Sequence, residues 1–325
     1  MASSGSVDFS LTRDNMIARA FEMAGIINEG GTPSSTQLTI GAQLLNMAVK
    51  QWSGTADFSG QKMQSRKRAY LFLSEDNAIY TLGPTTTQTG TTNKWASSYV
   101  TTTLSAAEAA SQTVISLTSI TGISDTDRIG IELDDGTIHW SVVSGSPSAG
   151  TATIANALAS AAASGNRVFT YATTNQGRRP LSILTASLRS FDSNNVPSDV
   201  PINAHTILER YEANTSKATD SDPSEMYYEA TLTDGTAYLN YEPSDVAKII
   251  RCVYLSPIED FDAAGDTPDF SQEWYLPFVI KLGMLTCINY RMPITQDMKD
   301  AYGEALTIAR NLNPETSELY FQCNA

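Results

Sequence analysis

The stretch Trp274–Tyr290 reads WYLPFVIKLGMLTCINY and is the most apolar part of the 325-residue chain. Its large apolar residues recur at helical spacing, at Trp274, Phe278, Leu282, Leu285 and Ile288. Lys281 and Asn289 interrupt the stretch, so a buried helix explains it better than a membrane span does. Because such a helix is apolar on most sides, we expect it at the centre of a group of helices or in a subunit interface.

Three amphipathic helices are predicted to accompany this apolar helix. Two of them, at about 12–24 and 35–52, are joined by a Gly-Gly-Thr-Pro turn, with Ser34 and Ser35 as N-cap candidates for the second. The third runs from about 295 to 312, where an Asn-Pro pair ends it. Each helix has a single apolar stripe that requires a partner. We therefore expect four aromatic residues of the helices to lie in the subunit interface: Trp52, Trp274, Phe278 and Tyr302.

Short β-strands are predicted between the two helix pairs. Residues 69–73 and 78–82 read as a β-hairpin, and an Asp-Gly pair at 234–235 predicts the turn of a second hairpin. Further strands are expected at 181–189, 205–211, 226–232, 237–241 and 248–255. Residues 85–177 are rich in Ser, Thr and Ala and contain short apolar runs between Gly turns, which favours a small β-barrel or sandwich.

The predicted fold class is α+β. N- and C-terminal helix pairs form a helical bundle beside an antiparallel β-sheet or barrel, and a small all-β domain is inserted. The expected domains are a discontinuous core at 1–84 and 178–325, the inserted domain at 85–177, and a C-terminal docking tail at 313–325.

The charge balance is strongly acidic, with 35 Asp and Glu against 21 Lys and Arg and a net charge of −14. A protein that grips DNA through its phosphates needs a surplus of cations to displace counterions, so ordinary nucleic-acid binding is excluded. An acidic surface instead suits a protein that DNA must slide past. Three scattered cysteines, Cys252, Cys287 and Cys323, provide neither a disulfide framework nor a zinc site.

The chain offers little that predicts catalysis. Only two histidines occur, His139 and His205, and the motifs of serine hydrolases, P-loop proteins and zincins are missing. Asp125–Gly130 resembles the start of an EF-hand loop, but Ile129 replaces a ligand and Gly136 stands where that loop needs Glu. We therefore predict no enzyme activity and no catalytic, cofactor-binding or metal-binding residue.

Two surface features are candidates for contacts with partners. Basic residues flank both junctions of the inserted segment: Arg66, Lys67, Arg68, Arg178 and Arg179. They could form a positive band that meets a partner or the DNA backbone, or charged strand edges that prevent association between sheets. The apolar patch Leu319, Tyr320 and Phe321 near the C-terminus could dock on a partner or pack on its own subunit.

Several segments together resemble the head-to-tail adaptor, or connector, proteins of short-tailed bacteriophages. The N-terminal part contributes MIARAFEMAGII at 16–27 and QLLNMAVKQW at 43–52. The C-terminal part contributes, in the same order, MYYE at 226–229, TAYLNYEP at 236–243, the apolar helix and LYFQ at 319–322. Residues 85–177 depart from the shorter adaptors and are similar to small β-domains inserted in longer virion proteins.

The resemblance implies a virion structural protein at the head–tail junction that is assembled in the host cytoplasm. Its expected partners are copies of itself in a closed ring of about twelve subunits, the portal protein and the tail nozzle protein. The insertion would project outward, toward nozzle or tail fibres, and genomic DNA would pass through the lumen without sequence-specific binding. The portal-docking role falls on Leu319, Tyr320 and Phe321, and no membrane partner is expected.

Two rival functions are left open by the residues. A phage tail adhesin or glycan hydrolase would use the inserted segment as a sugar-binding module, with Trp95, Tyr99 and Trp140 as aromatic platforms. A soluble acidic scaffolding factor would act during assembly and be absent from mature particles.

Overall fold

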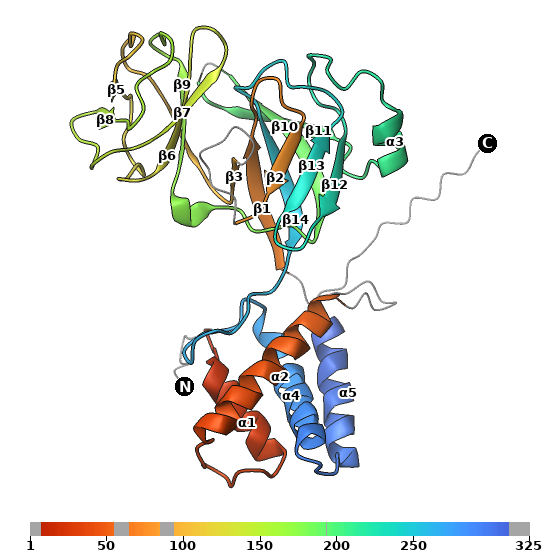
Figure 1. The fold of residues 1–325 in the computed structure, drawn as a ribbon. Helices are drawn as coiled ribbons and strands as arrows, with labels where there is room; N and C mark the ends of the chain where they lie inside the picture. The colour runs from red at the N-terminus through yellow and green to blue at the C-terminus, as the bar shows by residue number, and fades with distance from the viewer. Residues whose placement is uncertain (1–7, 55–64, 85–93, 193, 312–325) are drawn as a thin grey trace, which may run out of the picture. The chain divides into compact units, whose positions relative to one another are not determined.

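The structure, a computed structural model, describes residues 8–54, 65–84, 94–192 and 194–311 (Figure 1). The chain divides into two compact units, of which the first combines 1–65 with 257–325 and the second is 66–256. The second unit is therefore inserted into the sequence of the first. The division falls at 65/66 and 256/257.

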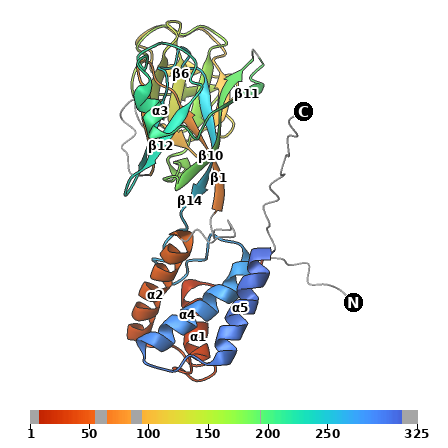
Figure 2. The same cartoon turned by 90° about the vertical axis from the view of Figure 1, so that its right-hand side faces the viewer.

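The first unit consists of helices around one apolar core. Its α-helices are α1 (Arg13–Met23), α2 (Ser35–Gly54), α4 (Tyr275–Asn289) and α5 (Gln296–Asn311), with a short 3-10 turn, η2 (Gln272–Trp274), before α4. Helix α4 contacts α1, α2 and α5 and crosses between α2 and α5 (Figure 2). Met16, Phe21, Leu45 and Phe278 lie in the shared core without exposed surface.

Local sequence signals explain where these helices begin. The Thr12 hydroxyl accepts a hydrogen bond from the Asn15 N–H at 3.3 Å and caps α1. At the start of α2, the Gln37 N–H donates to Ser34 Oγ at 3.3 Å and the Ser34 N–H donates to Gln37 Oε1 at 2.7 Å. This reciprocal pair is a capping box, so the prediction of Ser34 as an N-cap is confirmed.

Two sheets of the second unit enclose a common core. One sheet has the order β11-β10-β14-β1-β3 and the other β12-β13-β2. The strands of the first are β1 (Ser65–Phe72), β3 (Trp95–Ala96), β10 (Ser182–Phe191), β11 (Pro197–Ile202) and β14 (Ile249–Ser256). Those of the second are β2 (Ile79–Leu82), β12 (Met226–Ala230) and β13 (Gly235–Leu239). Trp95, Tyr80 and Tyr254 are the largest side chains buried between them.

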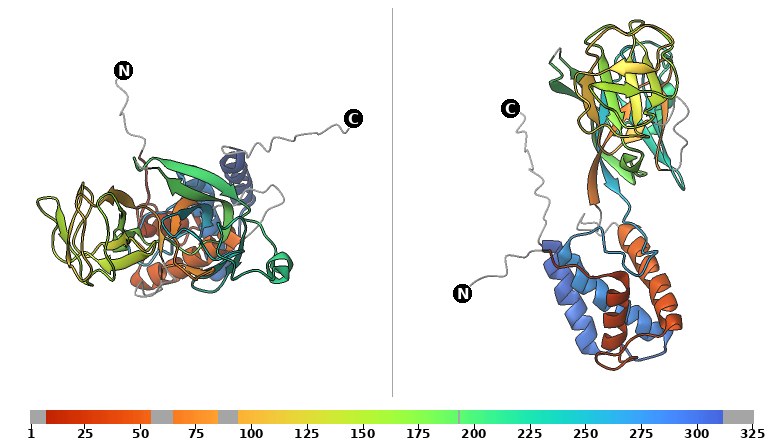
Figure 3. Two further views of the ribbon diagram at one scale, coloured as in Figure 1. Left: turned by 90° about the horizontal axis from the view of Figure 1, so that it is seen from above. Right: turned by 90° about the vertical axis from the view of Figure 1, so that its left-hand side faces the viewer.

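The remaining strands of the second unit form a lobe with its own core, which stands beside the other strands in Figure 3. A four-stranded sheet of order β4-β9-β6-β7 accompanies the pair β5-β8. Their bounds are β4 (Val100–Thr103), β5 (Val114–Ser116), β6 (Arg128–Glu132), β7 (Ile138–Val142), β8 (Thr151–Thr153) and β9 (Arg167–Tyr171), followed by η1 (Thr173–Asn175). Phe72 of β1 stacks on Tyr171 with ring centroids 5.4 Å apart and joins the lobe to the larger sheet.

The fold class predicted from the sequence is wrong. The described chain is a mixed α+β protein in which strands outnumber helices and are spread over several separate sheets. It is not a bundle of N- and C-terminal helices that carries one sheet or barrel and one small insertion. The strands pair between segments far apart in sequence, which apolar periodicity does not reveal.

The observed strand pairing and helix positions also test three predictions for single elements. The hairpin of 69–73 with 78–82 is wrong, because β1 lies in the five-stranded sheet whereas β2 pairs with β13. The strand predicted at 205–211 is wrong as well, since the short helix α3 (Leu208–Ala213) occupies this region. The hairpin predicted around the Asp-Gly pair is confirmed, because β12 and β13 are antiparallel neighbours, but its loop is 231–234 and Gly235 is already the first residue of β13.

Candidate functional site

The four aromatic residues predicted for a subunit interface lie together inside one chain. The Trp52 ring contacts the rings of Trp274, Phe278 and Tyr302, with centroids 5.7, 5.4 and 6.4 Å apart. Phe278 has no exposed surface, and Trp52, Trp274 and Tyr302 are half-buried. The cluster therefore joins α2, α4 and α5 of a single subunit, and Phe278 has no surface to offer to a neighbour.

Other residues of the same helices expose large apolar side chains. Each of the four helices of the first unit has at least one such residue: Met23 on α1 (47% exposed), Met47 on α2 (59%), Leu276 and Ile288 on α4 (55% and 64%), and Ile308 on α5 (54%). Isolated exposed apolar residues are ordinary, but their presence on every helix of one unit leaves apolar surface that a partner could cover.

The predicted basic residues do not gather at one place in the second unit. Arg66, Lys67 and Arg68 lie at the start of β1. Arg178 follows Gln176, which pairs with Ala96 opposite Tyr70, and its carbonyl accepts the Trp95 indole N–H at 3.0 Å. Arg178 thus lies beside the Phe72 end of β1, whereas Arg68 lies near the start of this strand. Each residue of a strand adds about 3.3 Å, so the two side chains start well apart. Arg179 donates to the Thr231 carbonyl at 2.6 Å. A continuous positive band is therefore not supported.

The predicted portal-docking residues Leu319, Tyr320 and Phe321, and with them the tail 313–325, lie outside the described residues. The docking role of the tail consequently stays a prediction.

The imidazoles of His139 and His205 contact the carbonyls of Asn156 and Leu184, at 3.2 and 2.9 Å. Among the described residues, no group of three or more His, Cys, Asp or Glu side chains could hold a metal ion. Burial raises the pKa of the Cys252 thiol to about 12, so this cysteine is a poor nucleophile. Within the described helices, none is long and apolar enough to span a membrane.

The EF-hand-like segment has a structural role. The Asp125 carboxylate accepts the Gly145 N–H at 2.7 Å, and the Asp127 carboxylate accepts the Ser124 N–H at 2.8 Å. Both carboxylates thus stabilise turns near the start of β6 by accepting backbone N–H groups.

One pocket in the second unit has a wall of tyrosine rings. Tyr227 of β12 and Tyr238 of β13 are directly opposite each other in the ladder, and their rings stack with centroids 5.6 Å apart. Tyr211 of α3 packs against both rings, at 6.2 and 5.2 Å. The Lys217 ammonium lies 4.1 Å from the Tyr211 ring centroid and helps to hold this ring. Three elements therefore fix one aromatic wall.

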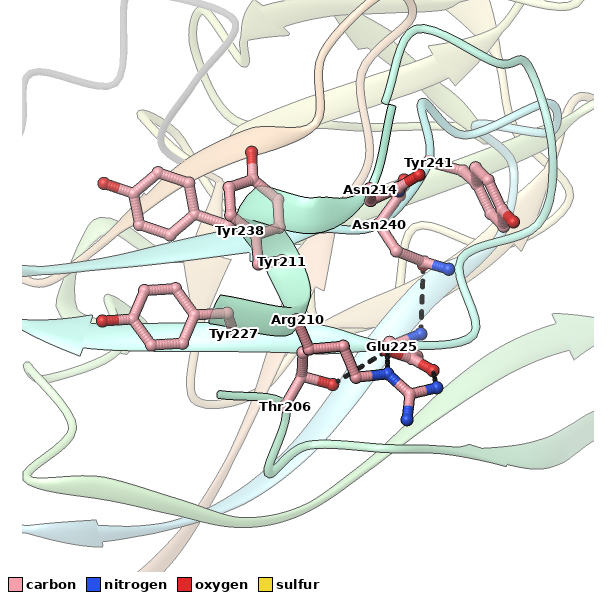
Figure 4. Close-up of a pocket in the computed structure, with 9 residues that line it drawn as sticks. All are labelled: Thr206, Arg210, Tyr211, Asn214, Glu225, Tyr227, Tyr238, Asn240 and Tyr241. Carbon is pink, nitrogen blue, oxygen red and sulfur yellow. Dashed lines mark hydrogen bonds and ion pairs between the residues drawn. The ribbon is translucent and has the colours of Figure 1, made fainter. Parts of the chain in front are cut away.

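Polar groups form the other side of this pocket (Figure 4). The Arg210 guanidinium donates two hydrogen bonds to the Glu225 carboxylate, which also accepts the Thr206 hydroxyl at 3.2 Å. The Asn240 carboxamide oxygen accepts the backbone N–H groups of Ser224 and Glu225, each at 3.0 Å. These bonds give the polar side chains defined partners on this side of the pocket.

Sequence reasoning missed this pocket and named other aromatic residues instead. Trp95, proposed as a sugar platform, is completely buried in the core, and Trp140 packs against Phe72 and Tyr171. The signal that could have found the pocket is the pair of Tyr-containing strands on either side of the Asp-Gly turn. Their register places Tyr227 beside Tyr238, whereas the contribution of Tyr211 depends on a helix that was predicted as a strand.

The comparisons with known proteins return no match: no protein-family model matches the chain, and neither does any curated protein or solved structure.

Proposed function

We propose that the protein is a virion structural component, a head-to-tail adaptor that assembles into a ring between the portal and the tail nozzle of a short-tailed bacteriophage. The observation that carries this proposal is the apolar surface on all four helices of the first unit. The resemblance of the N- and C-terminal segments to adaptor proteins points to the same role, and the occupant of this surface is then a second copy of the chain.

The energetics favour an assembly in which the same weak contact between subunits is repeated. Completely burying a large aliphatic side chain stabilises an association by about 1.5–3 kcal/mol before the entropic costs. Side chains that are about half exposed therefore contribute little to one contact. In a closed ring every subunit makes the same contact twice, so a weak interface gives a stable assembly. The net charge of −14 opposes adhesion of DNA to the lumen.

The decisive experiment measures the mass of the particles that the purified protein forms and images these particles. Light scattering and negative-stain microscopy, alone and with the portal complex, are expected to reveal closed rings. Ile288→Asp and Leu276→Asp should weaken ring formation, because each places a charge in the proposed contact. Leu232→Asp is the matched control, since Leu232 is 93% exposed but belongs to the second unit. A protein that stays monomeric even with the portal complex contradicts the proposal.

The same material distinguishes the rival functions. An adaptor must be present in purified virions in stoichiometric amounts, whereas a scaffolding factor must be absent, and mass spectrometry measures this directly. An adhesin should lose its function when the inserted lobe is removed, whereas an adaptor should still form rings. The Ser97 N–H donates to the Asn175 carbonyl at 2.7 Å, so replacing 98–174 by a short turn removes the lobe and retains the buried Trp95.

A further inference from the structure

The tyrosine pocket of the second unit has features that belong to a ligand site and that a ring adaptor does not require. Its cavity of about 170 Å³ is lined by Tyr211, Tyr227 and Tyr238 and by the ion pair of Arg210 with Glu225. Pockets for drug-sized ligands measure about 300–1,000 Å³. The cavity therefore suits a ligand fragment of one small ring that reaches onward into solvent.

The charges of the pocket disfavour an ionic ligand. Arg210 is bound to both carboxylate oxygens of Glu225, so the two charges neutralise each other. Burial raises the pKa of Tyr211 and Tyr238, and their phenols therefore stay neutral near pH 7. A neutral ligand is consequently expected.

The pocket combines aromatic and polar side chains, and this combination limits the chemistry of the ligand further. Aromatic rings pack favourably against the C–H groups of a ligand, and phenol hydroxyls can donate or accept hydrogen bonds. The Arg210 guanidinium has five N–H groups, of which Glu225 takes two, so the others can donate to hydroxyl groups of a ligand. A ligand that combines apolar C–H faces with many neutral hydroxyl groups is a sugar.

We propose that this pocket binds a neutral saccharide, one sugar ring of which lies between the tyrosine rings and the Arg210–Glu225 pair. The site is independent of the adaptor role and lies outside the inserted lobe that sequence reasoning named for sugar binding. A single-ring site with few contacts binds weakly, with a dissociation constant on the order of 1 mM.

Ligand-observed NMR on the full-length protein tests the proposal with three neutral probes: maltotetraose, cellotetraose and chitotetraose. At least one is expected to show saturation transfer from the protein. Tyr227→Ala and Tyr238→Ala should each weaken that binding by about tenfold, because each removes part of the aromatic wall. Tyr227→Phe retains the ring and should retain most of the binding, which separates loss of the ring from loss of the fold.

Two controls make the result specific. Glu304→Ala changes an exposed residue on helix α5 of the first unit, and it should leave binding unchanged. Tetragalacturonate carries the same kind of rings with negative charges and should bind more weakly than the neutral probes. The proposal is overturned if none of the neutral probes binds, if tetragalacturonate binds more tightly, or if binding survives in both alanine variants.

Discussion

Lys94 is an unusual residue because its ammonium is buried without a carboxylate contact among the described residues. Its side chain is 5% exposed, its Nζ lies 3.3 Å from the Ser74 hydroxyl oxygen, and it lies 4.9 Å from the centroid of the Trp140 ring. Burial lowers the pKa of Lys94 from its usual 10.5 to about 7. The ammonium thus costs free energy in the folded state, which a cation–π contact offsets only in part.

This lowered pKa makes the stability depend on pH. Between about pH 7 and pH 10.5 the unfolded chain retains the Lys94 proton and the folded chain does not, so the free energy of unfolding should rise with pH. Lys94→Met should remove this slope and stabilise the protein at pH 6 by about 2–4 kcal/mol. Urea unfolding at pH 6, 8 and 9.5 measures the effect. Lys299→Met, on the exposed face of α5, is the control that should keep the slope.

At the scale of elements, Gly41 sets how closely two helices approach. It lies within α2, where an added methyl group would collide with Ile17 of α1 and approach the ring of Phe21 to 3.3 Å. Gly41→Ala should therefore destabilise the first unit by about 1–3 kcal/mol through overpacking. Gly303→Ala on α5 is the matched control, since nothing lies within 4 Å of its added methyl group. Higher helix propensity should make this control neutral or stabilising by about 0.5–1 kcal/mol. Equal effects in the two variants would contradict the argument.

The edge strand β11 is protected from pairing with another chain by its prolines. Asn203, just beyond β11, directs its N–H and carbonyl away from β10, toward Ser224 and Met226. By strand alternation, positions 197, 199 and 201 also point their backbone groups outward. Pro197 and Pro201 remove two of these three donors, which leaves an edge poorly suited to strand addition.

Pro197→Thr with Pro201→Thr should therefore make the protein self-associate as its concentration rises. The change restores two outward N–H donors on an exposed strand without touching the core. Light scattering over a concentration series measures the effect. Pro293→Thr, at an exposed proline outside the helices and strands, controls for the chemistry of the substitution. Unchanged scattering of the double variant would mean that the prolines do not protect this edge.

The elements differ in how well the sequence predicted them. The expected helices at 12–24, 35–52 and 295–312 agree closely with α1, α2 and α5, because a helix follows from local periodicity and caps. Strand partners depend on distant segments, so the sequence placed β2 beside β1 when it pairs with β13. Strand β11 was not predicted, because its two prolines are unusual in a strand, and α3 was predicted as a strand. The tyrosine pocket needs both α3 and the register of β12 with β13, so the sequence could indicate the pair of Tyr227 and Tyr238 but not the contribution of Tyr211.

At the scale of the whole molecule, the two units have separate apolar cores. Ile17, Leu45 and Phe278 belong to the core of the first unit, and none of them is shared with the cores of the second. The second unit is continuous in sequence, from 66 to 256, whereas the first needs both ends of the chain. We therefore expect residues 66–256 to fold when expressed alone, because a domain with its own core does not need its neighbour to bury apolar surface.

This isolated second unit also tests where self-association resides. Calorimetry should give it one cooperative transition that matches a transition of the full-length protein. It should stay monomeric in light scattering at concentrations where the full-length protein forms rings, because the proposed contact uses helices of the first unit. Rings formed by residues 66–256 alone would move the contact to the sheets and contradict the role assigned to Leu276 and Ile288. The reverse experiment, with the first unit alone, requires a new linker between its two helix pairs. The isolated second unit needs no such linker and therefore gives the clearer test.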